Sequence, residues 1–396
     1  MLYIHIPYCA AKCLYCDFYS GGNPDWEALR CCLCNELELR LASESHGLPA
    51  SMGSIYFGGG TPSMMPPDIF AVLIDDILTT LARHGIEIDK NVEFTIEVNP
   101  EDVDMNHIMR WKESGVNRVS MGVQSLSDDE LQLLRRRHSS DKAVEASWLL
   151  RENFSNISFD IIYGIPHKTP THAMKDESSF SRHSALKRLE KTMAGLLSIN
   201  PDHISAYSMM YEEGTALTHL RDIGKINPAD DDTVIAMYTL VSTMLESAGL
   251  EQYEISNYAR PGYRSRHNSG YWSGKPYLGI GPSACSFDGA CTRRSNYSDL
   301  KGYIANFTSP HPAIFYHKET LSKEERREEV IFTQLRRKEG IDLDYFTRKF
   351  GNQSTSRLIA DAENALSASD LILTDTSLSL SRQAIMKSDS IILNLI

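Results

Sequence analysis

The sequence predicts an α/β fold whose core is a partial barrel of six parallel strands. Short β-rich runs alternate with longer helical patterns over the first two thirds of the chain. Strands separated by helices of this length form βαβ units and a parallel sheet. Six such units are too few for a closed eightfold barrel and suit a curved, open one. In that architecture the active face lies at the carboxyl ends of the strands.

The predicted elements follow from residue type and periodicity. The strand segments are rich in Ile, Val, Tyr and Phe and are bounded by Gly, Pro or Asn. We expect strands at 2–7, 53–59, 91–98, 117–125, 157–164 and 203–210. Helical patterns predict helices at 25–43, 67–83, 127–135, 141–153, 185–199 and 230–249. The polar stretch 167–184 predicts a loop insertion.

The alternation of strands and helices fades after residue 210. Residues 253–300 are rich in Tyr, Asn, Gly and Arg without clear periodicity, and a short helical module begins near residue 320. We therefore predict three domains. They are a partial barrel at 1–212, an α+β barrel extension at 213–315, and a small, mainly helical, winged-helix-like domain at 316–396.

Composition excludes several classes of protein. The formal charge of −12 argues against nucleic-acid binding, which needs clustered cations. No apolar run reaches the roughly 18 residues of a membrane span, which leaves only peripheral membrane contact, and no export signal precedes the first strand. We therefore expect a cytoplasmic protein. In that reducing compartment the eight cysteines are interpreted as metal ligands or catalytic groups in preference to disulfides. The oligomeric state does not follow from composition.

Three cysteines follow the first strand in "YCAAKCLYCDFYS". Cys9, Cys13 and Cys16 have the spacing CX3CX2C, and thiolates select zinc or iron–sulfur clusters. Because a structural zinc site wants four protein ligands, three thiols better suit a [4Fe–4S] cluster with one iron open to a small molecule. The alternatives are a zinc site or three unrelated buried thiols.

Polar and glycine residues recur at the ends of the predicted strands. In "YFGGGTPS", Gly59, Gly60 and Thr61 let a ligand approach the backbone closely, although a tight turn explains the glycines equally well. Four further polar side chains lie at or just beyond strand ends, namely Glu97, Gln124, Arg136 and Asp160. They either pair with one another inside the barrel or bind a polar cofactor.

The cysteine motif, with Tyr15 before its last cysteine, resembles that of the radical S-adenosylmethionine (SAM) superfamily. This resemblance implies a (β/α)6, TIM-like barrel, a [4Fe–4S] cluster, SAM on the open iron, and an electron donor that drives SAM cleavage. "YIHIPYCAAKCLYCDF", "EVNPE", "RVSMGVQSLSDDEL", "DIIYGIP" and "YEISNYARPG" narrow it to the oxygen-independent coproporphyrinogen III oxidase group. The implied SAM contacts are Tyr3, Tyr15, Gly59, Gly60, Thr61, Glu97, Gln124, Arg136 and Asp160.

Within that group the chain is more similar to the haem-chaperone branch, the HemW family. It starts two residues before Tyr3, has "CDF" at 16–18, and carries "SRHNSGYW", which matches the HNxxYW haem-binding motif. The implied haem contacts are His267, Asn268, Tyr271 and Trp272, and the implied partners are haem and haem-acceptor proteins. The alternatives are radical decarboxylation of coproporphyrinogen III and another radical SAM activity such as methyl transfer.

Two features need separate interpretation. Cys285 stands in "YLGIGPSACS" where this family usually has a histidine, and a thiolate is also an iron ligand. Cys31, Cys32 and Cys34 lie in a predicted helix and are expected to be small hydrophobic residues. Arg293 and Arg294 are either solvated or paired with porphyrin propionates.

Overall fold

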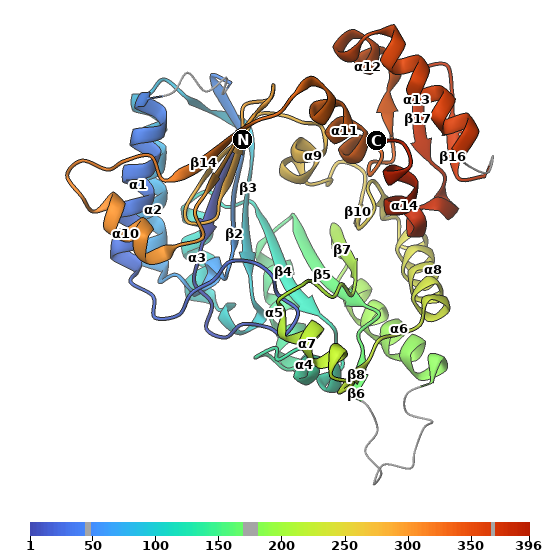
Figure 1. Cartoon of the computed structure of the whole chain (residues 1–396). Coiled ribbons are helices and arrows are strands. Elements are labelled where there is room, and N and C mark those ends of the chain that lie inside the picture. Colours follow the sequence, from blue (N-terminus) through green and yellow to red (C-terminus); the bar gives the residue numbers. More distant parts are fainter. Residues whose placement is uncertain (44–48, 169–180, 366–368) are drawn as a thin grey trace.

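The computed structural model describes residues 1–43, 49–168, 181–365 and 369–396 (Figure 1). Most of the loop insertion predicted at 167–184 falls at 169–180 and so lies outside the described residues. The described ends of that stretch are structured, because β6 (His167–Lys168) pairs with β8 (Ile226–Asn227) and α6 (Arg182–Ser198) begins two residues after the gap.

A curved, nine-stranded sheet forms the centre of the described structure, with the order β11-β1-β2-β3-β4-β5-β7-β10-β9. All six predicted strands are present, and each runs parallel to its neighbour. These strands are β1 (Leu2–Ile6), β2 (Ser51–Gly59), β3 (Glu87–Val98), β4 (Arg118–Gln124), β5 (Ile157–Tyr163) and β7 (His203–Ser208). The predicted α/β class with a parallel sheet is therefore confirmed.

Three strands beyond residue 213 extend this sheet at its two edges. β11 (Leu278–Ile280) pairs in parallel with β1, whereas β10 (Asn257–Ala259) and β9 (Glu251–Gln252) continue antiparallel from β7. Strands from both sides of the predicted boundary at 212–213 thus share one sheet. Periodicity did not indicate them, because runs of two or three residues are too short to show a pattern.

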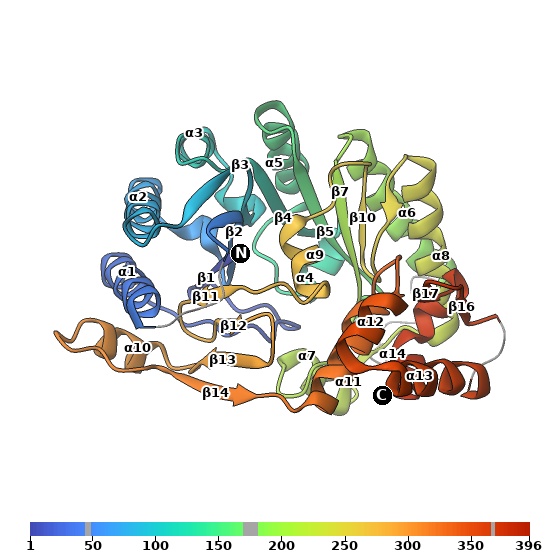
Figure 2. The same ribbon diagram turned by 90° about the horizontal axis from the view of Figure 1, so that it is seen from above.

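Helices cover the convex face of the sheet (Figure 2). They are α1 (Trp26–Ser43), α2 (Pro67–Arg83), α3 (Met105–Glu113), α5 (Ser140–Asn153), α6 and α8 (Asp231–Ser247). All except α3 were predicted, together with the short α4 (Asp128–Leu133). α3 buries Ile108 and Trp111 and is capped by Asp104, whose side chain accepts a hydrogen bond from the His107 N–H.

The extension adds a second layer against the first strands. Its antiparallel sheet has the order β12-β13-β14; two of its helices precede the sheet strands and the third lies between β13 and β14. The elements are α7 (Ala216–Asp222), α9 (Arg266–Trp272), β12 (Cys285–Phe287), β13 (Thr292–Asn296), α10 (Leu300–Phe307) and β14 (Tyr316–Thr320). In Figure 2, α9 lies on the concave side of the central sheet.

The C-terminal residues pack around a hydrophobic cluster of their own, which includes Ile331, Phe346 and Leu378. The mainly helical composition of this C-terminal region agrees with the prediction from the sequence. The domain boundaries predicted from the sequence stay predictions. The elements are α11 (Lys323–Gln334), β15 (Ile341–Asp342), α12 (Leu343–Phe350), α13 (Asn352–Ala365), β16 (Leu371–Leu373), β17 (Ser377–Leu380) and α14 (Ser388–Leu393). No helix among the described residues is both long and apolar enough to cross a bilayer.

Candidate functional site

The three motif cysteines lie in the loop between β1 and α1, and all three are half-buried free thiols. The Cys9 Sγ atom lies 3.0 Å from the Thr61 hydroxyl oxygen, and the Arg136 guanidinium donates to the Cys13 Sγ atom at 3.6 Å. Burial raises the pKa of the Cys9 and Cys16 thiols, so metal binding there must displace protons. Among the described residues, no three His, Cys, Asp or Glu side chains are already gathered closely enough to hold one metal ion.

The glycine run brings the end of β2 against the cysteine loop. The Gly60 N–H donates to the Ile6 carbonyl at 2.7 Å, and a Cβ atom on Gly60 would lie 2.5 Å from the Tyr8 carbonyl oxygen. Gly59 has a φ of +106°, which side chains disfavour. The glycines therefore meet a steric need, and Thr61, which is 4% exposed, reaches the cysteine loop through its hydroxyl.

Two half-buried carboxyl groups, Glu97 and Asp160, lie close enough to interact electrostatically inside the barrel. Glu97 on β3 accepts hydrogen bonds from the Tyr56 hydroxyl at 2.8 Å and from the Gly59 N–H at 3.2 Å. Burial, with a smaller contribution from the nearby Asp160, raises the pKa of Glu97 to about 7. Burial also raises the pKa of Asp160, although Ser120 and Ser205 donate hydrogen bonds to it.

Gln124 and Arg136 approach the same stretch of β4. Gln124 is 9% exposed and has a φ of +65°, where the pairing of β4 with β5 is bulged. The Arg136 guanidinium donates to the Asn99 side chain and to the Gly122 carbonyl, both at 2.7 Å. A Cβ atom on Gly122 would lie 2.9 Å from the Gln124 amide nitrogen and 3.3 Å from Arg136.

Sequence reasoning missed a buried cation close to these groups. Arg118 opens β4, is 1% exposed, and has Nε and Nη1 atoms without a hydrogen-bond partner among the described residues. Its positive charge favours the ionised forms of Glu97 and Asp160. The available signal was an arginine at the start of a strand that is otherwise buried, in "NRVSMGVQ".

Of the two predicted tyrosines, Tyr3 lies on β1, before the cysteine loop, and Tyr15 lies within that loop. The Tyr3 hydroxyl lies 3.1 Å from the His5 Nδ1 atom, and its ring is 6.2 Å from that of Tyr56. Tyr15 is half-buried, and burial raises the pKa of its phenol, with Arg136 and Cys13 as charged neighbours. The predicted SAM residues therefore lie on β1 to β5 and in the loops that follow these strands, although Tyr3 is near the amino end of β1 and Asp160 is in the middle of β5 and not at its end.

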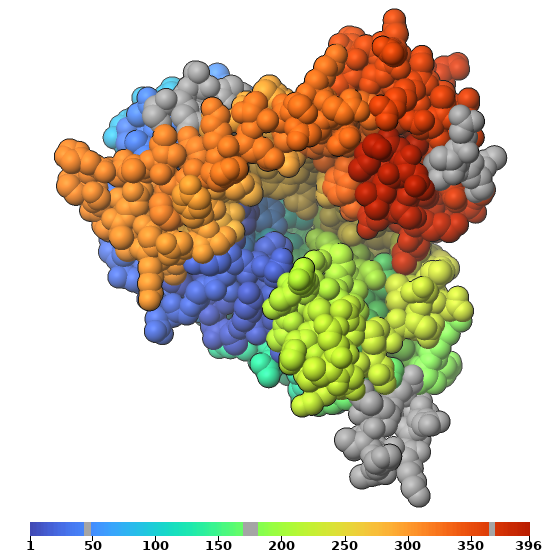
Figure 3. Space-filling view, in the orientation of Figure 1, coloured from blue at the N-terminus to red at the C-terminus, as the bar shows by residue number. Residues whose placement is uncertain are grey.

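A cleft of about 400 Å³ opens beside the cysteine loop. In Figure 3 this face of the molecule is hollowed between the blue N-terminal segment and the orange and red C-terminal segments. The cleft is lined from the cysteine loop by Asp17, Phe18 and Tyr19, from α9 by Tyr271 and Trp272, and from the extension and α11 by Tyr277, Cys285, Phe287, Arg293 and Arg326. Two residues of the predicted haem motif thus face it.

The histidine of that motif lies elsewhere. His267 is 1% exposed, its Nδ1 atom lies 2.9 Å from the Ser54 hydroxyl, and its Nε2 atom lies 2.9 Å from the Tyr271 hydroxyl. Burial lowers its pKa to about 3, so the imidazole is neutral. Neither ring nitrogen is free for iron in this arrangement. Asn268 is half-buried beside it and does not line the cleft.

The remaining cysteines agree with the hydrophobic interpretation. Cys32 is 0% exposed in the core, Cys31 and Cys34 are half-buried on α1, and Leu29, Leu33 and Leu37 are fully buried on the same helix.

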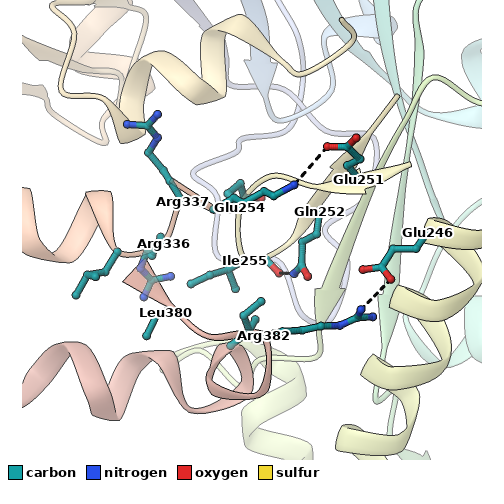
Figure 4. A pocket seen from close by; sticks show the side chains of 12 residues that line it. Glu246, Glu251, Gln252, Glu254, Ile255, Arg336, Arg337, Leu380 and Arg382 are labelled. Carbon is teal, nitrogen blue, oxygen red and sulfur yellow. Dashed lines mark hydrogen bonds and ion pairs between the residues drawn. The ribbon is translucent and has the colours of Figure 1, made fainter. Parts of the chain in front are cut away.

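A second cavity of about 340 Å³ separates the barrel edge from the C-terminal residues (Figure 4). Its charged side chains are largely paired with one another, for example Arg382 with Glu246 at 2.9 Å and Lys338 with Glu251 at 3.3 Å. None of the predicted site residues lines it. We therefore interpret it as a polar boundary between barrel and C-terminal region.

The residues around the cysteine loop fit a cluster and SAM. Three thiols with a guanidinium and a hydroxyl beside them can hold thiolate charge on a cluster. Carboxyl, amide and guanidinium groups at the neighbouring strand ends suit the amine, carboxylate and ribose of SAM. When bound, such a cluster supplies the electron for SAM cleavage, and the protein supplies position.

Comparisons with known proteins place this geometry in a family. A model of the radical SAM superfamily matches residues 3–176, and a model of the HemN C-terminal domain matches residues 321–386. The heme chaperone HemW of Bacillus subtilis (strain 168) is 32% identical over 357 residues, which cover 88% of this chain and 86% of that protein. The mitochondrial radical S-adenosyl methionine domain-containing protein 1 of Danio rerio is 31% identical over 406 residues, covering 99% of this chain and 85% of that protein.

A solved structure supports the fold. The coproporphyrinogen III oxidase HemN of Escherichia coli matches with a TM-score of 0.78 at 18% identity, covering 100% of this chain and 89% of that one. This likeness concerns the fold and not the reaction. The chain therefore belongs to the radical SAM superfamily, whose members use a [4Fe–4S] cluster and SAM, and within it to the family of the heme chaperone HemW.

Proposed function

We propose that this chain binds a SAM-ligated [4Fe–4S] cluster and haem, and passes haem to acceptor proteins in the cytoplasm. The observation that carries the proposal is the cleft beside the cysteine loop, together with the similarity to HemW proteins over most of the chain. Cys9, Cys13 and Cys16 hold the cluster, and the polar residues at the strand ends hold SAM. An electron donor for the cluster remains a prediction.

The cleft has the chemistry that a porphyrin needs. Its lining contains the rings of Phe18, Tyr271, Trp272 and Tyr277, and flat aromatic rings can cover a porphyrin face. Phe18 is 66% exposed, so its ring is accessible to a ligand in the cleft. The cleft residues Asp17, Phe18 and Tyr19 follow Cys16 directly in the sequence, so bound haem lies close to the cluster.

Anaerobic reconstitution followed by haem titration tests this proposal. The full chain should take up about four iron atoms in a cluster, and haem should then shift its Soret absorption with saturation. Trp272→Ala should weaken haem binding, whereas Trp148→Ala, on the outer helix α5 and 45% exposed, should leave it unchanged. Transfer is measured as loss of haem to an apo-haem protein.

The competing activity is the conversion of coproporphyrinogen III by radical decarboxylation. It is measured in the same preparation with SAM and a reductant. Conversion to protoporphyrinogen IX over many turnovers would replace the chaperone proposal with an oxidase.

A further inference from the structure

The cleft contains one side chain that is both accessible and able to bind iron strongly. Cys285 on β12 is exposed and lines the cleft together with Tyr271 and Trp272. His267, by contrast, is buried, with both ring nitrogens in hydrogen bonds. We infer that the Cys285 thiolate is the axial ligand of haem iron in this chain, with Arg293 and Arg326 binding the propionates. This inference rests on the proposed function and specifies its site.

The surroundings of Cys285 suit a metal-bound thiolate. Its Sγ atom lies 3.5 Å from the hydroxyl oxygen of Ser295 on the neighbouring strand β13, and a hydrogen bond to sulfur stabilises a thiolate ligand. Tyr271 and Tyr277 line the cleft together with the thiol. Burial raises the pKa of both phenols, and the nearby Cys285 contributes to this rise. Aromatic rings therefore stand beside the place where iron would bind.

Two arginines supply the positive charge for the propionates. Arg326 is 5% exposed, its guanidinium lies 4.6 Å from the centre of the Phe287 ring, and its buried Nε atom has no hydrogen-bond partner among the described residues. Arg326 and Arg293 both form ion pairs with the single carboxylate of Glu329. A second carboxylate in the cleft would complete the pairing, and the guanidinium fork suits a carboxylate.

Ligation of haem iron by Cys285 requires no change in the buried core. A bond from His267 to iron would break its hydrogen bond to Ser54 or to Tyr271, and would leave a buried polar group without a partner. Ligation by Cys285 breaks no buried hydrogen bond, because the residue is exposed. The thiol releases its proton to solvent as the sulfur–iron bond forms, and no electron is transferred.

The test is haem spectroscopy on the full chain with its cluster loaded, so that Cys9, Cys13 and Cys16 are occupied. Ferric haem is added, and ligation is recorded by electron paramagnetic resonance and by the ferrous–CO Soret band, which moves strongly to the red with a thiolate ligand. Wild type should give the thiolate signature. Cys285→Ser should lose it and weaken haem binding by about tenfold or more.

Cys291→Ser is the matched control. Cys291 follows the same strand, is half-buried, and does not line the cleft, so its variant should keep the thiolate signature. Iron content of the cluster and circular dichroism report whether each variant is folded. Cys285→His should change the spectrum to that of imidazole ligation while haem still binds.

The outcomes separate this inference from the proposed function. Wild type that binds haem without a thiolate signature, or Cys285→Ser that keeps one, overturns the ligand assignment and leaves haem binding intact. Wild type that binds no haem overturns the proposed function itself. Loss of the signature in Cys285→Ser alone, with a normal cluster, supports the inference.

Discussion

A close backbone contact at the glycine run predicts that Gly60→Ala impairs cluster loading. An added Cβ atom would lie 2.5 Å from the Tyr8 carbonyl oxygen and 2.8 Å from the Ile6 carbonyl oxygen. Ordinary carbon–oxygen contacts are no shorter than about 3.3 Å, so the cysteine loop must move by roughly 0.8 Å. Both clashing atoms belong to the backbone and cannot rotate away.

The displacement is large compared with the tolerance of a metal site. Metal–ligand distances in proteins vary by only about 0.2 Å. Cys9 follows Tyr8 directly, and its thiol is within hydrogen-bond distance of Thr61, the residue after Gly60. Overpacking of this kind also costs about 1–3 kcal/mol of stability. We therefore expect Gly60→Ala to lower both the iron content and the melting temperature.

Iron and sulfide per chain after anaerobic reconstitution, and thermal unfolding of the same samples, measure the two effects. The control is Gly53→Ala on β2, the strand that leads into Gly60, where an added Cβ atom meets no atom within 4 Å. Iron content and melting temperature equal to wild type in Gly60→Ala would show that the loop adapts, and would refute the argument from close approach.

Three further predictions follow from buried polar groups. Burial raises the pKa of Glu254 from 4.5 to about 7, so the fold keeps a proton that the unfolded chain releases, and stability falls as pH rises between these values. Glu254→Gln should therefore be more stabilising near pH 8 than near pH 5, by up to about 3 kcal/mol. Tyr303→Phe removes a 2.7 Å hydrogen bond to the buried Glu36 carboxyl and should cost about 1.5–3 kcal/mol in denaturant unfolding. Glu93→Gln should weaken haem binding, since the Glu93 carboxylate accepts from the first N–H groups of α9, and loosening that helix disturbs the cleft wall.

Exposed counterparts serve as controls for these variants. Glu251→Gln, at a side chain 54% exposed, should show no comparable pH dependence of stability, and Tyr297→Phe, at a residue 50% exposed, should leave unfolding unchanged. Equal pH profiles for Glu254→Gln and wild type, or a Tyr303→Phe variant as stable as wild type, would contradict the corresponding argument.

The six predicted strands and all but one of their helices were predictable because each carries a repeating pattern over at least five residues. β11, β10 and β9 escaped because two or three residues show no period, and their place depends on pairing with strands far away in sequence. The cysteine loop and strand-end residues were predictable from motifs. Their hydrogen bonds, such as that between the Cys9 thiol and Thr61, were not, since they join residues 52 positions apart.

The haem motif shows most clearly what residue type alone cannot predict. Sequence identifies an imidazole in an aromatic context, but the availability of a ring nitrogen depends on Ser54, which lies 213 residues away on β2. The same structure places an exposed thiol where the family histidine is expected. A wall formed by Asp17, Phe18 and Tyr19 joins that thiol's cleft to the cysteine loop. If cluster binding shifts this wall and thereby changes the affinity for haem, then by reciprocity haem binding must change the affinity for the cluster by the same factor.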